Sequence, residues 1–112
     1  MSLSQLRYFV TVAEEGHVGR AAQRLFVAQP AVSRQIRALE DELGTPLFSR
    51  TPRGMSLLPP GQVFLQHARA ILTAVDCAAT AARAARHSQS ERAAEPSTVP
   101  SAAAPPKPAG SA

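Results

Sequence analysis

The apolar residues between positions 30 and 44 have a spacing that strongly limits how this chain can fold. Val32, Ile36 and Leu39 follow one another at steps of four and three residues, so they line one side of a helix with about 3.6 residues per turn. Pro30 suits the first turn of such a helix, where its missing N–H leaves no bond unmade. Gly44 suits its end. The opposite side is polar, although packing of the helix does not require polar residues there.

Two further amphipathic helices are predicted ahead of this segment. Apolar residues recur at three- and four-residue spacing over residues 4–15 and again over the shorter stretch 18–25, as expected for helices with one buried side. The second helix is expected to have a weak N-cap, because neither His17 nor Gly19 is among the best capping residues. Residues 26–29 then form a tight connection to the third helix.

A β-hairpin is predicted after the third helix. Residues 46–58 are too few for another helix and are rich in turn residues. Short strands over residues 47–50 and 55–58, joined by the turn T-P-R-G at residues 51–54, fit this composition. Two short helices joined by a tight turn, the second with an outward polar side and a hairpin behind it, form a winged helix-turn-helix.

A long helix is predicted over residues 60–86. Its apolar residues alternate steps of four and three, and one small domain cannot cover so long an apolar side. A second copy of the same helix can cover it, which predicts a homodimer with a coiled-coil-like seam. The residues expected in this seam are Phe64, Ala68, Ile71 and Val75. Alternatively, the helix folds back onto its own domain.

The last part of the chain, residues 87–112, is expected to be a disordered tail. Of the 25 residues from position 88 onward, 17 are Ala, Pro or Ser and none is aromatic, so this segment cannot bury enough apolar surface to offset the entropy of ordering it. The predicted fold class is therefore mainly α. A winged helix-turn-helix domain over residues 1–58 is followed by a linker and dimerisation helix over 59–86 and by the tail.

The basic residues are segregated along the chain. Residues 16–39 contain four arginines and no acidic residue, and residues 43–61 contain two arginines and no acidic residue. A concentrated basic surface is expected for a protein that binds a polyanion. The alternative is an ordinary solvated surface, with Arg37 paired to Asp41 at a spacing of four residues.

The polar side of the third helix predicts contact with DNA bases. In a helix-turn-helix, the N-terminal half of the second helix of the motif enters the major groove, where Gln pairs with adenine and Arg with guanine. The residues predicted to read bases are Gln29, Pro30, Ser33, Arg34 and Arg37. Contacts to the DNA backbone, or from the wing, are predicted for Arg20, Arg24, Arg50 and Arg53.

Enzymatic activity is not expected from this sequence. His17, His67 and His87 lie far apart and show no metal-ligand spacing with Cys77, so neither a metal site nor a cofactor is predicted. No apolar run approaches the roughly 20 residues that a membrane helix needs, and contact with a membrane is not expected. One cysteine cannot form an internal disulfide, so a cytoplasmic location is expected.

The stretch AAQRLFVAQPAVSRQIRALEDELGTPLFSRTPRG, residues 21–54, strongly resembles the N-terminal DNA-binding region of LysR-type transcriptional regulators. The similarity runs from residue 3 to about residue 61. The resemblance implies a winged helix-turn-helix, dimerisation through a linker helix, and binding to interrupted inverted repeats in bacterial promoters. It also implies base contacts at Gln29, Pro30, Ser33 and Arg34, and wing contacts at Arg50 and Arg53.

Three departures from the family pattern affect these expectations. Gly19 stands where the family usually has Thr or Ser, and Leu58-Pro59-Pro60 replaces the usual Thr-Pro-Ala, so the linker helix is expected to begin without a good N-cap. Family members also continue into an α/β effector domain that binds a small inducer. Residues 87–112 cannot form such a domain, so a truncated regulator without inducer binding is expected.

Two other functions are compatible with the sequence. The chain could be an interaction module that pairs through its linker helix with a full-length regulator and inhibits it. It could also be a fragment without function, as the weak caps and the low-complexity tail would suggest.

Overall fold

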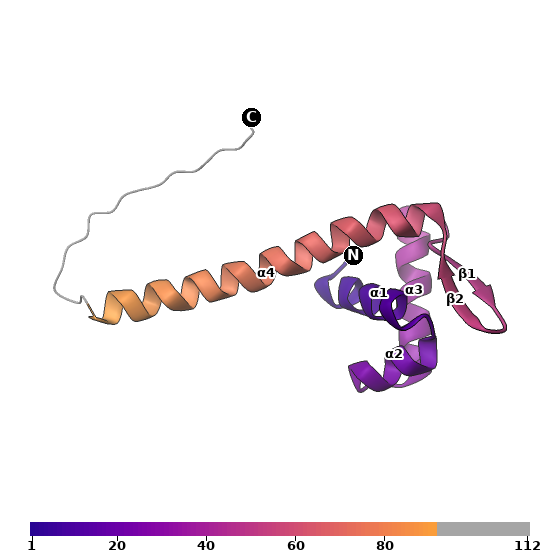
Figure 1. Ribbon diagram of the computed structural model, residues 1–112, viewed down its shortest axis with the longest axis horizontal. Helices are drawn as coiled ribbons and strands as arrows, with labels where there is room; N and C mark the ends of the chain where they lie inside the picture. The colour runs from indigo at the N-terminus through magenta and orange to yellow at the C-terminus, as the bar shows by residue number, and fades with distance from the viewer. Residues whose placement is uncertain (92–112) are drawn as a thin grey trace, which may run out of the picture. The chain divides into compact units, whose positions relative to one another are not determined.

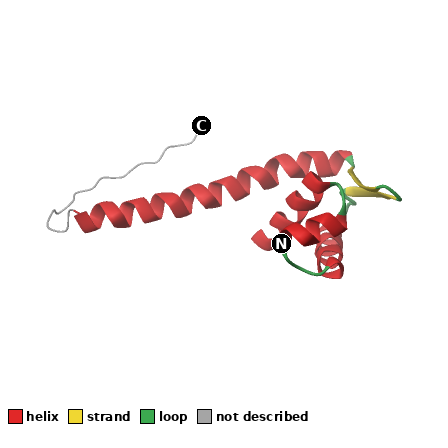
Figure 2. Cartoon of the chain, turned by 60° about the horizontal axis from the view of Figure 1, so that its bottom comes forward, coloured by secondary structure: helices red, strands yellow, loops and turns green. Residues whose placement is uncertain are grey.

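A computed structural model describes the backbone of residues 1–91 and the side chains of residues 1–86. The chain divides into two units, Met1–Cys77 and Ala78–Ala112. Three helices, a hairpin and a long helix follow one another along the chain (Figures 1 and 2). Their bounds are α1 Leu3–Glu15, α2 Val18–Leu25, α3 Gln29–Leu43, β1 Phe48–Thr51, β2 Gly54–Leu57 and α4 Pro59–Glu91. The prediction of a mainly helical chain with a hairpin wing is confirmed.

The predicted end of α4 was too early. The helix continues past Arg86 to Glu91, because no glycine or proline stands between these two residues to stop it. The expectation of a disordered tail concerns, beyond Glu91, residues outside the described part of the chain.

The core of the first unit is small and is built around Phe9. Its ring centroid lies 5.3 Å from that of Phe48 on β1 and 5.1 Å from that of Phe64 on α4. The Phe9–Phe64 pair has the edge-to-face arrangement that aromatic quadrupoles favour. One side chain of α1 therefore holds together elements whose contacting residues follow it by about forty and fifty-five positions. The other large, fully buried side chains are Val12, Val32, Ile36, Leu39 and Leu47.

The first turns of α4 pack against this core. Ala68 is fully buried, and Phe64, Leu65 and Leu72 are partly buried against the core. Two of the four residues predicted to form a dimer seam, Phe64 and Ala68, are thus used inside their own domain. This part of α4 follows the alternative in which the helix folds back. Ile71 remains 42% exposed.

The hairpin is attached through β2 to the end of α1. Its antiparallel register pairs Phe48 with Leu57 and Thr51 with Gly54, so the turn consists of two residues and each strand is shifted by one residue from its predicted range. On β2, the amide nitrogen of Met55 donates to the carbonyl of Gly16 at 3.0 Å. A Cβ at Gly54 would collide with that same carbonyl oxygen. The close approach of the two backbones therefore requires glycine at position 54.

The N-cap of α2 is His17. His17, not expected to be a good cap, has Nδ1 3.2 Å from the backbone nitrogen of Arg20 and accepts its hydrogen bond. An imidazole that accepts at Nδ1 carries its proton on Nε2. The ring is therefore held beside the first turn of the helix.

The turn between α2 and α3 contains a residue in an unusual conformation. Phe26 ends α2 with φ 59° and ψ 42°, in the left-handed region, and its side chain is 93% exposed. Glycine is the usual residue in this region because a Cβ makes it unfavourable by roughly 1–2 kcal/mol. The backbone is held there by hydrogen bonds from Phe26 to Gln23 and from Val27 to Ala22.

Replacing Phe26 by glycine is therefore expected to raise the free energy of unfolding by about 1 kcal/mol. The relief of left-handed strain exceeds the greater flexibility of glycine in the unfolded chain, and little buried surface is lost. Urea unfolding of both chains at one protein concentration measures the difference. A less stable glycine variant would contradict the argument.

No helix in the described part of the chain combines the length and apolarity that crossing a bilayer demands.

Candidate nucleic-acid interface

The buried side of α3 places its predicted base-reading residues on the exterior. Val32, Ile36 and Leu39 are all fully buried, and their spacing turns the remaining sides of the helix outward. Consistently, the side chains predicted to read bases are exposed, apart from half-buried Ser33; they are Gln29, Pro30, Ser33, Arg34 and Arg37. Gln29 is the first residue of α3, one position earlier than predicted.

The ion pairs of the first unit separate its arginines into two groups. Within the described residues, no ion pair involves Arg34 or Arg37, so the expected alternative of an Arg37–Asp41 pair is not formed. Arg20 and Arg53 are exposed and likewise outside these pairs. Binding of a polyanion to these four arginines would not require an ion pair among the described residues to break.

A groove brings the start of α3 and the wing together. It has a volume of about 270 Å³ and is lined by Gln29 and Ser33 from α3, Arg50 from β1, and His17 and Gly19 at the start of α2. Residues separated by more than twenty positions in the sequence thus share one surface. Its donors and acceptors could meet a base edge and a backbone phosphate of one ligand.

Glu40 holds the wing against α3. One carboxylate oxygen accepts hydrogen bonds from the backbone nitrogens of Leu47, at 2.7 Å, and Phe48, at 3.2 Å. The other oxygen lies 3.6 Å from a guanidinium nitrogen of Arg50. The carboxylate therefore satisfies backbone donors at the start of the wing and orients Arg50 along it. The sequence gives no signal for this role, because the backbone donors lie seven and eight positions beyond Glu40, outside α3.

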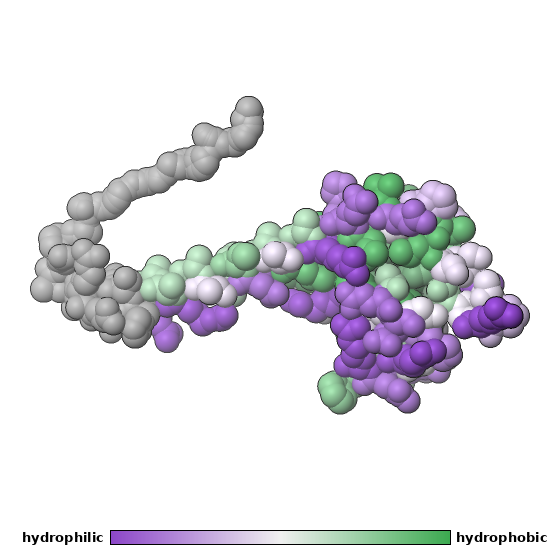
Figure 3. Space-filling view, in the orientation of Figure 1, coloured by the Kyte–Doolittle hydropathy of each residue, from purple (hydrophilic) through white to green (hydrophobic). Residues whose placement is uncertain are grey.

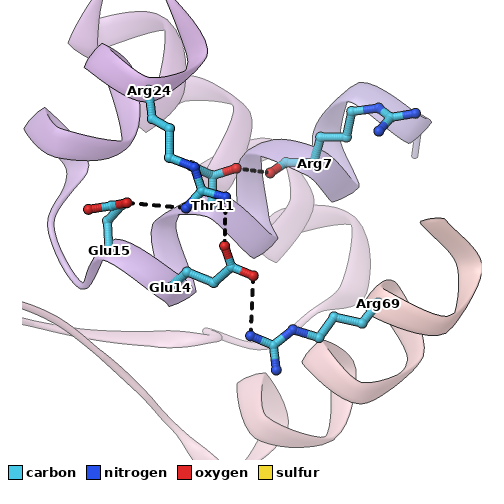
Figure 4. Close-up of polar contacts among 6 residues, drawn as sticks. All are labelled: Arg7, Thr11, Glu14, Glu15, Arg24 and Arg69. Atoms are coloured by element: carbon cyan, nitrogen blue, oxygen red, sulfur yellow. Dashed lines mark hydrogen bonds and ion pairs between the residues drawn. The ribbon is translucent and has the colours of Figure 1, made fainter. Parts of the chain in front are cut away.

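Arg24 takes part in a cluster that joins three helices. Its guanidinium contacts Glu14 at 2.8 Å and Glu15 at 3.1 Å on α1. Glu14 also contacts Arg69 of α4 at 3.3 Å (Figure 4). A backbone contact to DNA was predicted for Arg24, but here its charge is directed at carboxylates. No signal in the sequence links Glu14 to Arg69, 55 positions away.

This cluster gives the domain a predictable pH dependence. The hydrogen bond from Arg24 holds the pKa of Glu14 below its ordinary value of 4.5, and Arg69 adds to the shift, although partial burial opposes it. Because the folded-state pKa is the lower one, the contribution of Glu14 to stability is fully present above the unfolded-state pKa. It is lost as the pH falls through the folded-state pKa.

The stability advantage of the unmodified chain over Glu14→Gln is therefore expected to shrink on acidification. Urea unfolding of both chains between about pH 7 and about pH 2.5 measures it, since this range brackets the titration of an unfolded carboxyl and of one with a lowered pKa. Asp41→Asn, at an exposed position outside the cluster, controls for removal of one carboxylate. A difference that stayed constant with pH would contradict the assignment.

Three helices, an outward polar side on the third, and a hairpin beside it define a winged helix-turn-helix of the nucleic-acid-binding class. The chain belongs to the LysR family of bacterial regulatory helix-turn-helix proteins, whose family model matches residues 3–62. The resemblance noted in the sequence is thereby confirmed.

Curated relatives match the same part of the chain. The transcriptional regulator ClcR of Pseudomonas putida is 49% identical over 85 residues, which cover 76% of this chain and 29% of ClcR. BudR of Klebsiella aerogenes is 49% identical over 83 residues, covering 74% of this chain and 58% of BudR. The chain thus spans under a third of the length of ClcR.

Solved structures with the same fold include complexes with DNA. The DNA-binding domain of CbnR bound to DNA superposes with a TM-score of 0.74 at 44% identity, covering 77% of this chain and 99% of that one. The BenM DNA-binding domain on catB site 1 DNA gives a TM-score of 0.75 at 42% identity, covering 77% and 97%. At these identities the likeness extends beyond the fold to the domain's family.

Among the described residues, no group of three or more His, Cys, Asp and Glu side chains is placed to hold a metal ion. Cys77 is exposed and is a free cysteine.

Proposed function

We propose that this chain binds double-stranded promoter DNA sequence-specifically and thereby regulates transcription. The observation that carries the proposal is the groove between α3 and the wing, where Gln29, Ser33 and Arg50 meet. Arg34 and Arg37 lie on the same helix and form no ion pair with any described residue. This arrangement offers groups for base edges and for phosphates on one surface. Figure 3 displays the hydrophilic character of the hairpin tip. A location in the bacterial cytoplasm, where promoter DNA lies, follows from this function.

The residues of α3 and of the wing have different proposed roles. Gln29, Ser33, Arg34 and Arg37 read base edges in the major groove, with Pro30 against a thymine methyl group. Arg20, Arg50 and Arg53 bind the DNA backbone and set the register without specifying sequence. Arg24 reaches a phosphate only by sharing its guanidinium with Glu14 and Glu15.

We further propose that two copies associate through α4. Val63 and Ile71 are 60% and 42% exposed, and Val75 is half-buried, so apolar side chains of α4 remain for a partner after Phe64 and Ala68 are used in the core. A second α4 would cover them and present two reading helices to an inverted repeat. Sedimentation should show a dimer that Ile71→Asp weakens; an unchanged monomer in both chains would refute this part.

The experiment for the main proposal begins with duplexes selected by the purified chain from a random-sequence library. Fluorescence anisotropy then compares a selected duplex with a scrambled one at two salt concentrations. Preference for the selected duplex should survive the higher salt, while overall affinity falls because phosphate contacts release counterions.

Equal and salt-sensitive binding to both duplexes would refute sequence-specific readout. The leading alternative would then be a chain that pairs through α4 with a full-length regulator and inhibits it. A chain carrying Arg34→Ala and Arg53→Ala has both its α3 contacts and its wing contacts to DNA impaired. Inhibition of such a regulator by this chain would support that alternative.

A further inference from the structure

Gly19 lies in the first turn of α2, between two side chains that line the groove. A Cβ at position 19 would stand 2.9 Å from Cε1 and 3.1 Å from Nδ1 of His17, and 3.3 Å from Oε1 of Gln29. These separations are shorter than ordinary van der Waals contact. The absence of a side chain at Gly19 is therefore what leaves room for both neighbours.

The backbone at this position does not itself require glycine. The glycines with a positive φ among the described residues are Gly16, Gly44 and Gly54, whereas Gly19 has ordinary helical geometry within α2. Glycine weakens a helix interior relative to alanine. Space, not backbone conformation, thus accounts for glycine at position 19.

His17 cannot yield this space without a loss elsewhere. Its Nδ1 accepts the hydrogen bond from the backbone nitrogen of Arg20 at 3.2 Å, and it is the N-cap of α2. A ring pushed away by a side chain at position 19 would leave that backbone donor to water. The imidazole and the Gln29 amide therefore both lie close to Gly19 and form, with it, one unit across the starts of α2 and α3.

Gln29 is the member of this unit that is proposed to contact a base. It begins α3, and its side chain is exposed and lines the groove with Ser33 and Arg50. A glutamine that reads adenine must present Oε1 and Nε2 together, in the plane of the base. A small displacement of Oε1 is therefore enough to change which base edge it matches.

We infer that His17 and Gly19 are positioning residues for Gln29, so that the base preference contributed by Gln29 depends on the residues at positions 17 and 19. Neither residue needs to touch the base itself. The inference rests on the proposed function, in which Gln29 reads a base edge of double-stranded DNA. It adds that residues at the start of α2 position the Gln29 side chain and so determine which base it prefers.

The packing part of the inference is tested without DNA, by a double-mutant cycle. Gly19→Ala is made in the unmodified chain and in His17→Ser, which keeps a good N-cap and removes the ring. Alanine should raise the Tm of the chain that carries His17→Ser, through its better helix propensity. It should raise the Tm less, or lower it, when His17 is present. Equal shifts in both backgrounds would show that positions 17 and 19 are not coupled.

The readout part is tested by repeating the library selection with Gly19→Ala and with Gln29→Ala. Both variants should lose preference several-fold at the same base pair, while the preference at other positions, including those read by Arg34, stays unchanged. A general loss of stability would weaken all positions alike and so would not imitate this result. Gln23→Ala, at an exposed position of the same helix that does not line the groove and has no proposed DNA contact, is the matched control and should keep every base preference.

Two outcomes would overturn the inference while leaving the proposed function intact. Gly19→Ala could keep every base preference, or it could change positions that Gln29→Ala leaves untouched. If the unmodified chain itself selected no sequence, the proposed function would fail instead, and the thermal cycle would still report whether positions 17 and 19 are coupled.

Discussion

Replacing Phe9 by alanine is expected to lower the free energy of unfolding by about 3–5 kcal/mol. The ring is fully buried and packs between Phe48 and Phe64, so its removal leaves a cavity shared by α1, the wing and α4. Small domains have a total stability of about 5–15 kcal/mol. One substitution therefore removes a large part of it, and urea unfolding followed by circular dichroism should show a much lower midpoint.

The matched control for this variant is Phe26→Ala. It removes the same atoms from a ring that is 93% exposed and keeps a non-glycine residue in the left-handed conformation. Its expected change lies within about 0.5 kcal/mol, as for most surface substitutions. Similar losses in both variants would mean that Phe9 does not hold the core together as described.

The helices were predictable because the residues that determine their buried sides and their ends lie within or next to each helix. Steps of three and four residues in α1, α2 and α3 show which side is buried, and Gly16 and Gly44 end two of these helices in the left-handed conformation. The exposed polar side of α3 follows from the same periodicity. Local patterns of this kind are sufficient for the candidate site on α3.

Contacts between elements could not be predicted in the same way. Periodicity shows that a side of α4 is buried, but not whether its own domain or a second copy covers it; Phe64 and Ala68 turned out to face the core. Arg24 could not be separated from the arginines that form no ion pair among the described residues, since its partners Glu14 and Glu15 lie on another helix. The cap by His17 depends on ring orientation, which no propensity scale contains.

Arg34→Ala is expected to reduce the preference for a selected duplex over a scrambled one by about 1–3 kcal/mol, or roughly 5- to 150-fold. Arg34 is exposed on the polar side of α3 and outside the ion pairs formed by the described residues. It can therefore make a bidentate contact with guanine without first losing a carboxylate. Competition between the two duplexes, followed by anisotropy, measures the change.

Arg50→Ala should behave differently, because Arg50 lies on β1 and its guanidinium is held 3.6 Å from Glu40. A wing cation that binds phosphate supports all sequences alike, so both duplexes should weaken together, and the slope of affinity against salt should fall by about one counterion. Arg7→Ala removes the same charge from an exposed site on α1 and should change neither quantity. If Arg34→Ala instead weakened both duplexes equally, α3 would bind the backbone, and base reading would have to be sought elsewhere on the domain.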